Sequence, residues 1–147
     1  MNVLTNDTLA SAMIRCLEKK RYKVCVLFSH RQDLREFASV LSQEVKDVPG
    51  VLGVTCGTNS GRVVFENGSG IELLPFSENL RGVKCHDVLW DSLLDERPPD
   101  DFRNIVPYLV IRYHEDAIPK MPRLKGEWYM ETETPELDKF LLGLVAK

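Results

Sequence analysis

Residues 62–96 read RVVFENGSGIELLPFSENLRGVKCHDVLWDSLLDE, and this stretch decides the expected fold. Two β-rich runs, residues 62–66 and 71–75, flank the tetrapeptide Asn-Gly-Ser-Gly. Asn-Gly between such runs is the strongest local signal for a tight antiparallel hairpin. Residues 87–91, DVLWD, are mostly apolar and end in aspartate, which is typical of a buried strand that leaves a sheet. The stretch therefore predicts a hairpin followed by a buried strand.

The segment before this stretch begins with a helical pattern and a strand pattern. Apolar side chains recur at helical spacing across residues 7–21, behind the capping candidates Asn6 and Asp7. Residues 23–28, KVCVLF, are almost wholly apolar. Such a run suits a strand that is covered on both faces in a parallel sheet.

Two further helices are expected on either side of the hairpin region. Ser29 and Gln32 have the spacing of a capping box, which predicts a helix over residues 31–46. Near the end of the chain, Thr134 as cap and Pro135 at the first helical position predict a helix over residues 135–146. Its apolar stripe consists of Leu137, Phe140, Leu141, Leu144 and Val145.

This order of elements predicts an α/β fold, a three-layer sandwich with a mostly parallel sheet plus a β-hairpin and with helices on the faces. Residues 23–28 and 87–91 are expected to be central strands. Residues 101–105 are expected to form a helical turn, and residues 108–113, YLVIRY, a further strand. No linker is long enough to divide the chain, so residues 1–147 are expected to form a single α/β domain.

Composition supports a compact domain in the cytoplasm. The 147 residues are 44% hydrophobic and 28% charged, which is enough apolar material for a sizeable core. No run of about 18 apolar residues is present, and the first residues lack the pattern of a secretion signal. The four cysteines form no C-x-x-C pair, and we interpret them as reduced core thiols.

Charge is distributed unevenly along the chain. Residues 1–85 carry 11 basic and 9 acidic side chains, whereas residues 86–147 carry 8 basic and 13 acidic ones. The acidic second part disfavours broad contact with a phosphate backbone. A protein partner is expected and a membrane is not. Nucleic-acid binding and the oligomeric state stay open at this point.

Metal ligands of the histidine and cysteine type are not grouped in the sequence. Structural zinc sites use close ligand pairs, and here only Cys85 and His86 are near neighbours. Adjacent residues of a strand point to opposite faces of a sheet. The spacing therefore predicts no confident metal site of this type.

Residues 62–96 resemble part of the ATPase core of phage large terminases and related helicase-like proteins. In those proteins a hairpin with the pattern nGS-I is followed by RG and then by an apolar strand that ends in Asp-Glu. The similarity in element order extends over residues 7–113. The resemblance implies that Asp91 matches the magnesium-binding aspartate and that Arg81, followed by Gly82, matches the turn before that strand.

The chain departs from this family at the residues that handle phosphate. Ser92 stands where the family has its glutamate, and no Gly-Lys-Ser or Gly-Lys-Thr occurs in the chain. Without a glycine-rich loop and its lysine, the phosphates of ATP lose their main ligands. Asp95 and Glu96 are candidates for a shifted acidic pair with Asp91, although a solvated acidic helix end is the commoner reason for such a pair.

These observations lead to two expectations for function. The first is a small protein with a truncated terminase- or helicase-like ATPase core, of phage or mobile-element origin, that hydrolyses no ATP, needs no cofactor and acts by binding another protein in the host cytoplasm. The alternative is a magnesium-dependent nucleotide-binding or nucleic-acid-processing subunit that uses Mg and ATP. In the alternative, Asp91, Asp95 and Glu96 hold magnesium, and residues 57–61 (GTNSG) or a partner chain contact the phosphates.

Overall fold

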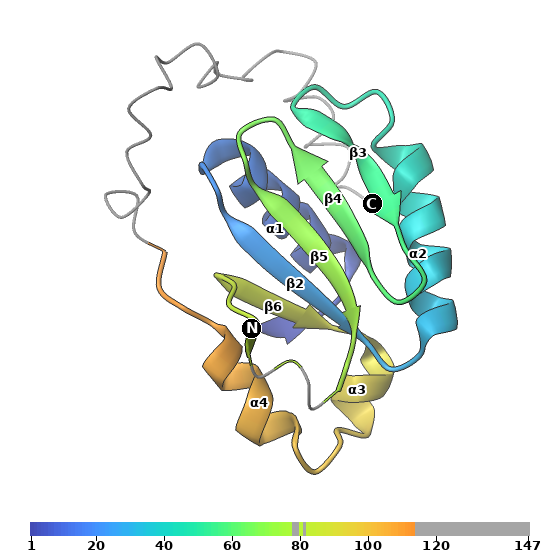
Figure 1. Cartoon of the computed structure of the whole chain (residues 1–147), viewed down its shortest axis with the longest axis vertical. Coiled ribbons are helices and arrows are strands. Elements are labelled where there is room, and N and C mark those ends of the chain that lie inside the picture. Colours follow the sequence, from blue (N-terminus) through green and yellow to red (C-terminus); the bar gives the residue numbers. More distant parts are fainter. Residues whose placement is uncertain (78–79, 81, 114–147) are drawn as a thin grey trace.

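A six-stranded sheet lies at the centre of the protein (Figure 1). The computed structural model describes residues 1–77, 80 and 82–113. The strand order is β1-β6-β2-β5-β4-β3. The pairs β1–β6, β6–β2 and β2–β5 are parallel, whereas β5–β4 and β4–β3 are antiparallel. The strands are β1 (Asn2–Val3), β2 (Lys23–Phe28), β3 (Val51–Cys56), β4 (Gly61–Phe65), β5 (Gly70–Pro75) and β6 (Asp87–Trp90).

In the described part of the chain, four helices pack on the two faces of this sheet. They are α1 (Asn6–Glu18), α2 (Arg31–Glu44), α3 (Ser92–Glu96) and α4 (Phe102–Leu109). One core cluster joins side chains of α1 and α2 to one face, and the other joins side chains of α3 and α4 to the opposite face. The expected α/β sandwich with a mostly parallel sheet and a hairpin is confirmed. The predicted helix over residues 135–146, and the part of the expected single domain after Tyr113, lie outside the described residues.

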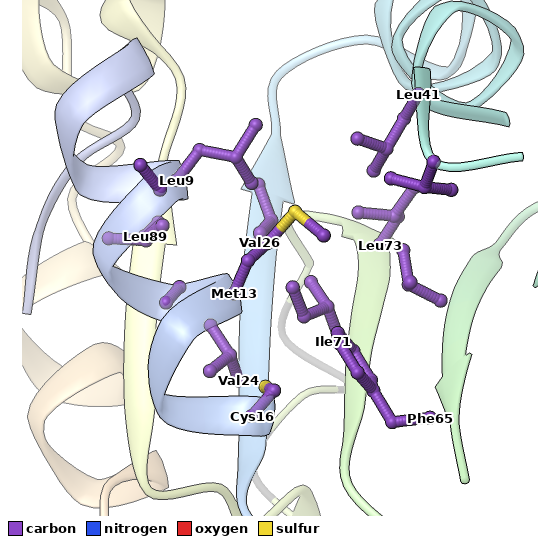
Figure 2. Packing of buried hydrophobic residues seen from close by; sticks show 14 of the residues in the cluster. Leu9, Met13, Cys16, Val24, Val26, Leu41, Phe65, Ile71, Leu73 and Leu89 are labelled. Atoms are coloured by element: carbon purple, nitrogen blue, oxygen red, sulfur yellow. The ribbon is translucent and has the colours of Figure 1, made fainter. Parts of the chain in front are cut away.

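Alternation along β2 explains why its sequence is almost wholly apolar. Val24, Val26 and Phe28 point into the cluster under α1 and α2, whereas Cys25 and Leu27 point into the cluster under α4. Figure 2 shows the first cluster, in which Met13 of α1 lies against Val26 and close to side chains of β5. A strand buried on both faces suits the interior of a sheet. β2 pairs with β5 and β6, and β6 pairs with β1 and β2, so the predicted central strands are confirmed.

The predicted hairpin is present as β4 and β5. Arg62 lies opposite Glu72, and Val63 lies opposite Ile71. Gly68 in the turn has a φ of +86°, a left-handed conformation that glycine adopts without steric cost. The Asn-Gly signal therefore located this turn correctly.

The hairpin turn also closes the end of α1. The side-chain amide of Asn67 donates to the carbonyl oxygens of Cys16, Leu17 and Lys19 at 2.7, 3.2 and 3.1 Å. The Ser69 hydroxyl donates to the Lys19 carbonyl at 2.6 Å and accepts from the backbone N–H of Tyr22 at 2.9 Å. The last carbonyls of a helix have no partner within the helix, so these bonds satisfy groups that would otherwise need water.

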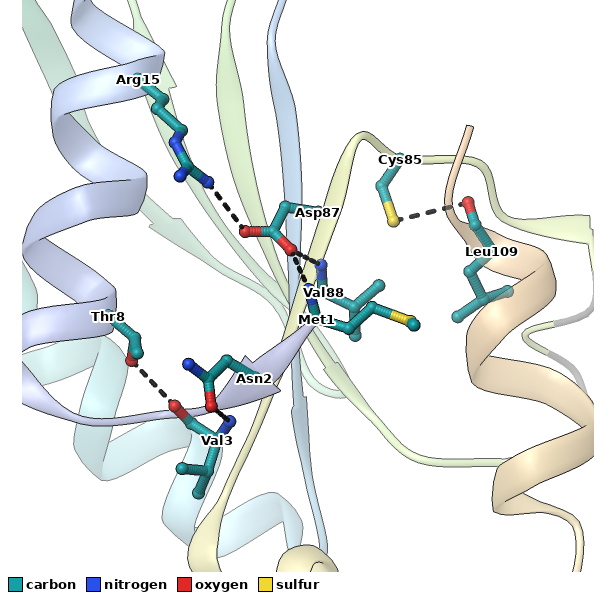
Figure 3. A network of polar contacts seen from close by, with 9 residues as sticks. All are labelled: Met1, Asn2, Val3, Thr8, Arg15, Cys85, Asp87, Val88 and Leu109. Atoms are coloured by element: carbon teal, nitrogen blue, oxygen red, sulfur yellow. Dashed lines mark hydrogen bonds and ion pairs between the residues drawn. The ribbon is translucent and has the colours of Figure 1, made fainter. Parts of the chain in front are cut away.

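Asp87, the first residue of β6, connects three elements near the last turn of α1 (Figure 3). Its carboxylate accepts from the Met1 amino group at 2.7 Å and from the Val88 backbone N–H at 2.9 Å. The Arg15 guanidinium lies 3.4 Å from the other carboxylate oxygen. These contacts hold β1 and α1 against β6.

The N-cap of α1 differs from the predicted residues. Thr5 occupies this position, and its hydroxyl accepts from the Thr8 backbone N–H at 3.1 Å. The Thr8 hydroxyl in turn accepts from the Thr5 backbone N–H at 2.7 Å. Asn6 and Asp7 already belong to the first helical turn, where the Asp7 charge is favourable. Thr5 and Thr8 form the two ends of a capping box, so the N-cap lies one residue before the predicted Asn6.

The predicted strand over residues 108–113 is wrong. The helical turn expected at residues 101–105 continues as α4 to Leu109, and Val110 makes only an isolated bridge to Cys85. Ile105, Val106 and Leu109 have helical spacing and are buried, so core contacts favour the helix. Pro107 is exposed within α4 and does not end it.

We expect Asn67→Ala to lower the free energy of unfolding by about 1–3 kcal/mol, because three helix-end carbonyls lose their donor. Urea denaturation measures this change. Asn104→Ala on the exposed side of α4 is the matched control and should change stability by less than about 0.5 kcal/mol. Equal stability of the two variants would show that the turn does not hold α1.

Candidate functional site

Asp91, the aspartate that the resemblance singles out, follows the carboxyl end of β6, beside the carboxyl end of β2. These strands are parallel neighbours, and the Asp91 backbone N–H donates to the Leu27 carbonyl at 3.0 Å. Ligands of open α/β sheets bind at this edge, outside the carboxyl ends of the strands. The topology therefore places Asp91 where a functional residue of this fold class is expected.

The Asp91 carboxylate makes three hydrogen bonds within the chain. One oxygen accepts from the Ser29 backbone N–H at 2.8 Å. The other accepts from the Ser29 hydroxyl at 3.0 Å and from the Leu94 backbone N–H at 2.9 Å. Asp91 therefore fastens the end of β2 to the end of β6 and caps the N-terminus of α3.

Ser29 is a site residue, although its sequence spacing predicts a helix-capping role. The predicted capping box of Ser29 and Gln32 is wrong, because the N-cap of α2 is His30, which makes no side-chain cap hydrogen bond. Ser29 instead turns toward Asp91. Its position at the end of a buried strand, parallel to the strand that ends at Asp91, is the signal that could have identified the pair.

The other candidate residues do not join this pair. The Asp95 carboxylate accepts from the Trp90 indole N–H at 3.0 Å, and Glu96 is exposed at the end of α3. Arg81 lies outside the described residues. Within residues 1–77, 80 and 82–113, no group of three His, Cys, Asp or Glu side chains is arranged to hold a metal ion.

The connections that could contact phosphate groups are short or join antiparallel strands. Only Ser29 and His30 separate the end of β2 from the start of α2. The glycine-serine loop of residues 57–61 leads from β3 into β4, which pair antiparallel. It does not precede a helix N-terminus, which is the arrangement that cradles phosphate in nucleotide-binding loops.

The Ser29–Asp91 pair has some of the groups that bind magnesium in other proteins. An ionised carboxylate has about four acceptor positions, and Asp91 uses three of them. In phosphate-loop ATPases a serine or threonine hydroxyl and an aspartate hold the metal together. Ser29 and Asp91 reproduce this pair of groups, but the described residues add no lysine or glycine-rich turn that would hold a nucleotide beside it.

Three of the four cysteines are core residues. Cys16, Cys25 and Cys85 are buried, which confirms their predicted place, whereas Cys56 is exposed at the end of β3, which contradicts it. Cys56 is the last residue of β3, which is the border strand of the sheet. Burial raises the pKa of the Cys16 thiol. A hydrogen bond between the thiols of Cys25 and Cys85 raises the pKa of Cys25 and lowers the pKa of Cys85.

His86 belongs to an aromatic cluster at the amino ends of the strands. Its ring stacks on Tyr22 at a centroid distance of 5.3 Å and meets the Tyr113 ring edge-on at 5.1 Å. Its Nδ1 accepts from the Lys23 backbone N–H at 2.9 Å. Burial, with smaller effects of the Lys23 and Lys19 charges, lowers the pKa of His86. His86 is therefore a neutral structural acceptor, on the opposite side of the sheet from Cys85.

Comparison with known proteins gives no further assignment. No family model, curated protein or solved structure matches this chain. Among the described residues, no helix has the length and apolar character needed to cross a membrane.

We expect Asp91→Ala to lower the free energy of unfolding by about 1–3 kcal/mol, since the half-buried Ser29 N–H and the start of α3 lose their acceptor. Chemical denaturation measures the loss. Asp100→Ala, at an exposed position between α3 and α4, serves as control and should stay within about 0.5 kcal/mol of the original protein. An undiminished stability of the Asp91 variant would contradict the structural role.

We expect the protein to lose stability in mild acid through His86. The folded protein binds the His86 proton only at a lower pH than the unfolded chain, so the unfolded chain binds more protons between the two pKa values. The stability that neutral His86 contributes is complete above about pH 6.5 and is lost as the pH falls through the pKa of His86 in the folded protein. Urea midpoints at about pH 7.5 and about pH 5.5 measure it.

His86→Asn keeps an acceptor near Nδ1 but removes the titration. The drop in midpoint between the two pH values should therefore shrink in this variant, while His30→Asn, at an exposed position, should retain it. A drop that is equally large in His86→Asn would assign the acid sensitivity to another group.

Proposed function

We propose that this protein is a small, non-hydrolysing protein with a truncated terminase- or helicase-like ATPase core, which acts by binding another protein. Fold alone does not preserve an ancestral activity, because activity depends on the groups at the site. The proposal therefore rests on what Asp91 and its surroundings do in this chain.

The observation that carries the proposal is the engagement of Asp91 in holding its own fold. Its carboxylate joins Ser29 to α3 through three hydrogen bonds, and β2 passes into α2 through only two residues. A phosphate-cradling loop needs several backbone N–H groups that converge on one anion. The short connection supports a scaffold role for this edge in place of ATP hydrolysis.

The edge strand β3 supports the binding half of the proposal. Among the residues that the structure describes, it pairs only with β4, and the other side of its backbone has no strand beside it there. Leu52 of β3 is 65% exposed, and Val40 of the adjacent helix α2 is 59% exposed. An unpaired edge strand accepts an extended segment of another protein as an additional strand, and nearby apolar side chains add specificity.

The partner class follows from the resemblance to packaging and helicase proteins. We infer that an extended segment of a nucleic-acid machine, or of a host defence complex that recognises one, pairs with β3. The acidic composition of residues 86–147 supports a protein partner more than direct contact with a phosphate backbone.

The second candidate is a magnesium-dependent nucleotide-binding subunit, and the Ser29–Asp91 pair is the observation that favours it. Calorimetric titration of the whole chain with Mg-ATP separates the two functions. The proposed binding protein gives no saturable heat. Saturable binding that is lost in Asp91→Asn, with folding retained by circular dichroism, would instead establish the nucleotide-binding function and a metal site at Ser29 and Asp91.

We expect a double variant, Leu52→Lys with Val40→Lys, to abolish capture of the partner from cells that contain it. Ser11→Lys on the exposed side of α1 is the matched control and should capture the same protein as the original chain. Amide hydrogens of β3 should exchange more slowly in the purified complex, because the added strand pairs with them. Equal capture by both variants would contradict binding through β3.

A further inference from the structure

The solvent side of α4 carries exposed apolar side chains. Tyr108 is 72% exposed, the largest exposed fraction among the large hydrophobic side chains of the described residues. Ile111, just after the helix, is 43% exposed, and Pro107 is exposed within it. The other side of α4 belongs to the core cluster under α4 through Ile105, Val106 and Leu109. The helix therefore buries one apolar side in the core and presents Tyr108 to solvent.

The chain around the end of α4 contributes cations and no acids. Residues 82–86 lie beside this end, because the Cys85 backbone N–H donates to the Leu109 carbonyl at 2.9 Å and the Ile111 N–H donates to the Cys85 carbonyl at 2.8 Å. Residues 82–86 and 102–113 together contain no acidic side chain but three Lys or Arg residues, Lys84, Arg103 and Arg112. Within the described residues, none of these three forms an ion pair.

Lys84 places one of these cations at Tyr108. Its ammonium donates to the Tyr108 carbonyl at 3.1 Å, at the C-terminal end of α4, where a positive charge complements the helix dipole. An ammonium has three donors, so two are left for a second acceptor. The acids closest in sequence do not compete for it. Asp87 is engaged in two ion pairs, and Asp101 stands at the opposite end of α4.

An exposed aromatic side chain among cations fits a protein partner. Tyrosine and arginine are enriched among the residues that dominate binding energy in protein interfaces. Facing surfaces of an interface carry complementary charge, so an acid-free surface of this kind selects a segment rich in Asp and Glu. A nucleic acid fits less well, because a protein held by the phosphate backbone makes about 6–10 phosphate contacts, whereas this surface has three cations.

We propose that an acidic segment of another protein binds the α4 surface, which consists of Lys84, Arg103, Tyr108, Ile111 and Arg112. Tyr108 is the apolar anchor, and the three cations face the carboxylates of the partner. α4 packs beside β2 and β6, whereas β3 lies three strands beyond β2 in the sheet. Figure 1 shows α4 and β3 at opposite ends of the molecule. The inference does not rest on binding through β3, and together the two surfaces would let one chain join two proteins.

Photo-crosslinking in the protein's own cells tests this surface. The photoreactive residue p-benzoylphenylalanine replaces Tyr108 in the full-length chain, and mass spectrometry identifies the crosslinked peptide. We expect a segment of another protein that contains more Asp and Glu than Lys and Arg. Adding Arg103→Glu and Arg112→Glu should reduce the crosslinked product about tenfold or more, because like charges then face each other. The same photoreactive residue at the exposed position of Ser11 is the control and should not label this segment.

A synthetic peptide of the labelled segment then gives the affinity by fluorescence anisotropy. Tyr108→Ala should weaken binding by roughly tenfold or more, as at other aromatic anchors. Circular dichroism checks that this variant and the double glutamate variant keep their helices. Leu52→Lys, which blocks the proposed strand addition at β3, should leave the affinity unchanged. The two proposals can therefore fail separately.

Several results would overturn the inference. The absence of any crosslink from position 108 is one, and labelling of a basic or uncharged segment is another. Labelling of a nucleic acid, of a second copy or of the same chain would each assign the α4 surface to a different occupant. Equal affinity of Tyr108→Ala and the original protein for the peptide would remove Tyr108 from the contact.

Discussion

The hydrogen bonds from the hairpin turn to the end of α1 are the constraint on which the rest of the fold depends. Asn67 and Ser69 satisfy the last carbonyls of α1 and receive the backbone of Tyr22, immediately before β2. Groups about 50 residues apart in sequence are thus fixed at one point. β2 and β5 run in parallel from this point, and the turn contacts favour their observed register, which decides the face that each of their side chains occupies.

Most elements of this fold could be predicted because each is specified by residues that are close together in the sequence. The hairpin follows from Asn67-Gly68, and the central place of β2 follows from an apolar run that only a doubly covered strand requires. Residues 108–113 were misread because β-branched and aromatic residues favour strands, whereas burial of Leu109 beside Cys85 selected a helix. The sequence did not indicate the cap at Thr5, because Thr8 stands where a capping box usually has glutamate or glutamine.

The candidate site shows where sequence reasoning stops. Asp91 was identified from a strand that ends in aspartate, but its partner Ser29 is 62 residues away and is brought to it only by the strand order. A hydroxyl-carboxylate pair at this edge can support a metal in one protein and a strand junction in another. Here the third bond, to the start of α3, and the short passage into α2 favour the junction.

The two borders of the sheet are unequal. β1 contributes two residues at one border, whereas β3 contributes six at the other, with a bulge at Leu52 between Val51 and Gly53. The two borders therefore expose unequal lengths of strand backbone. Short border strands limit edge-to-edge pairing, so β1 offers much less backbone for an added strand than β3 does.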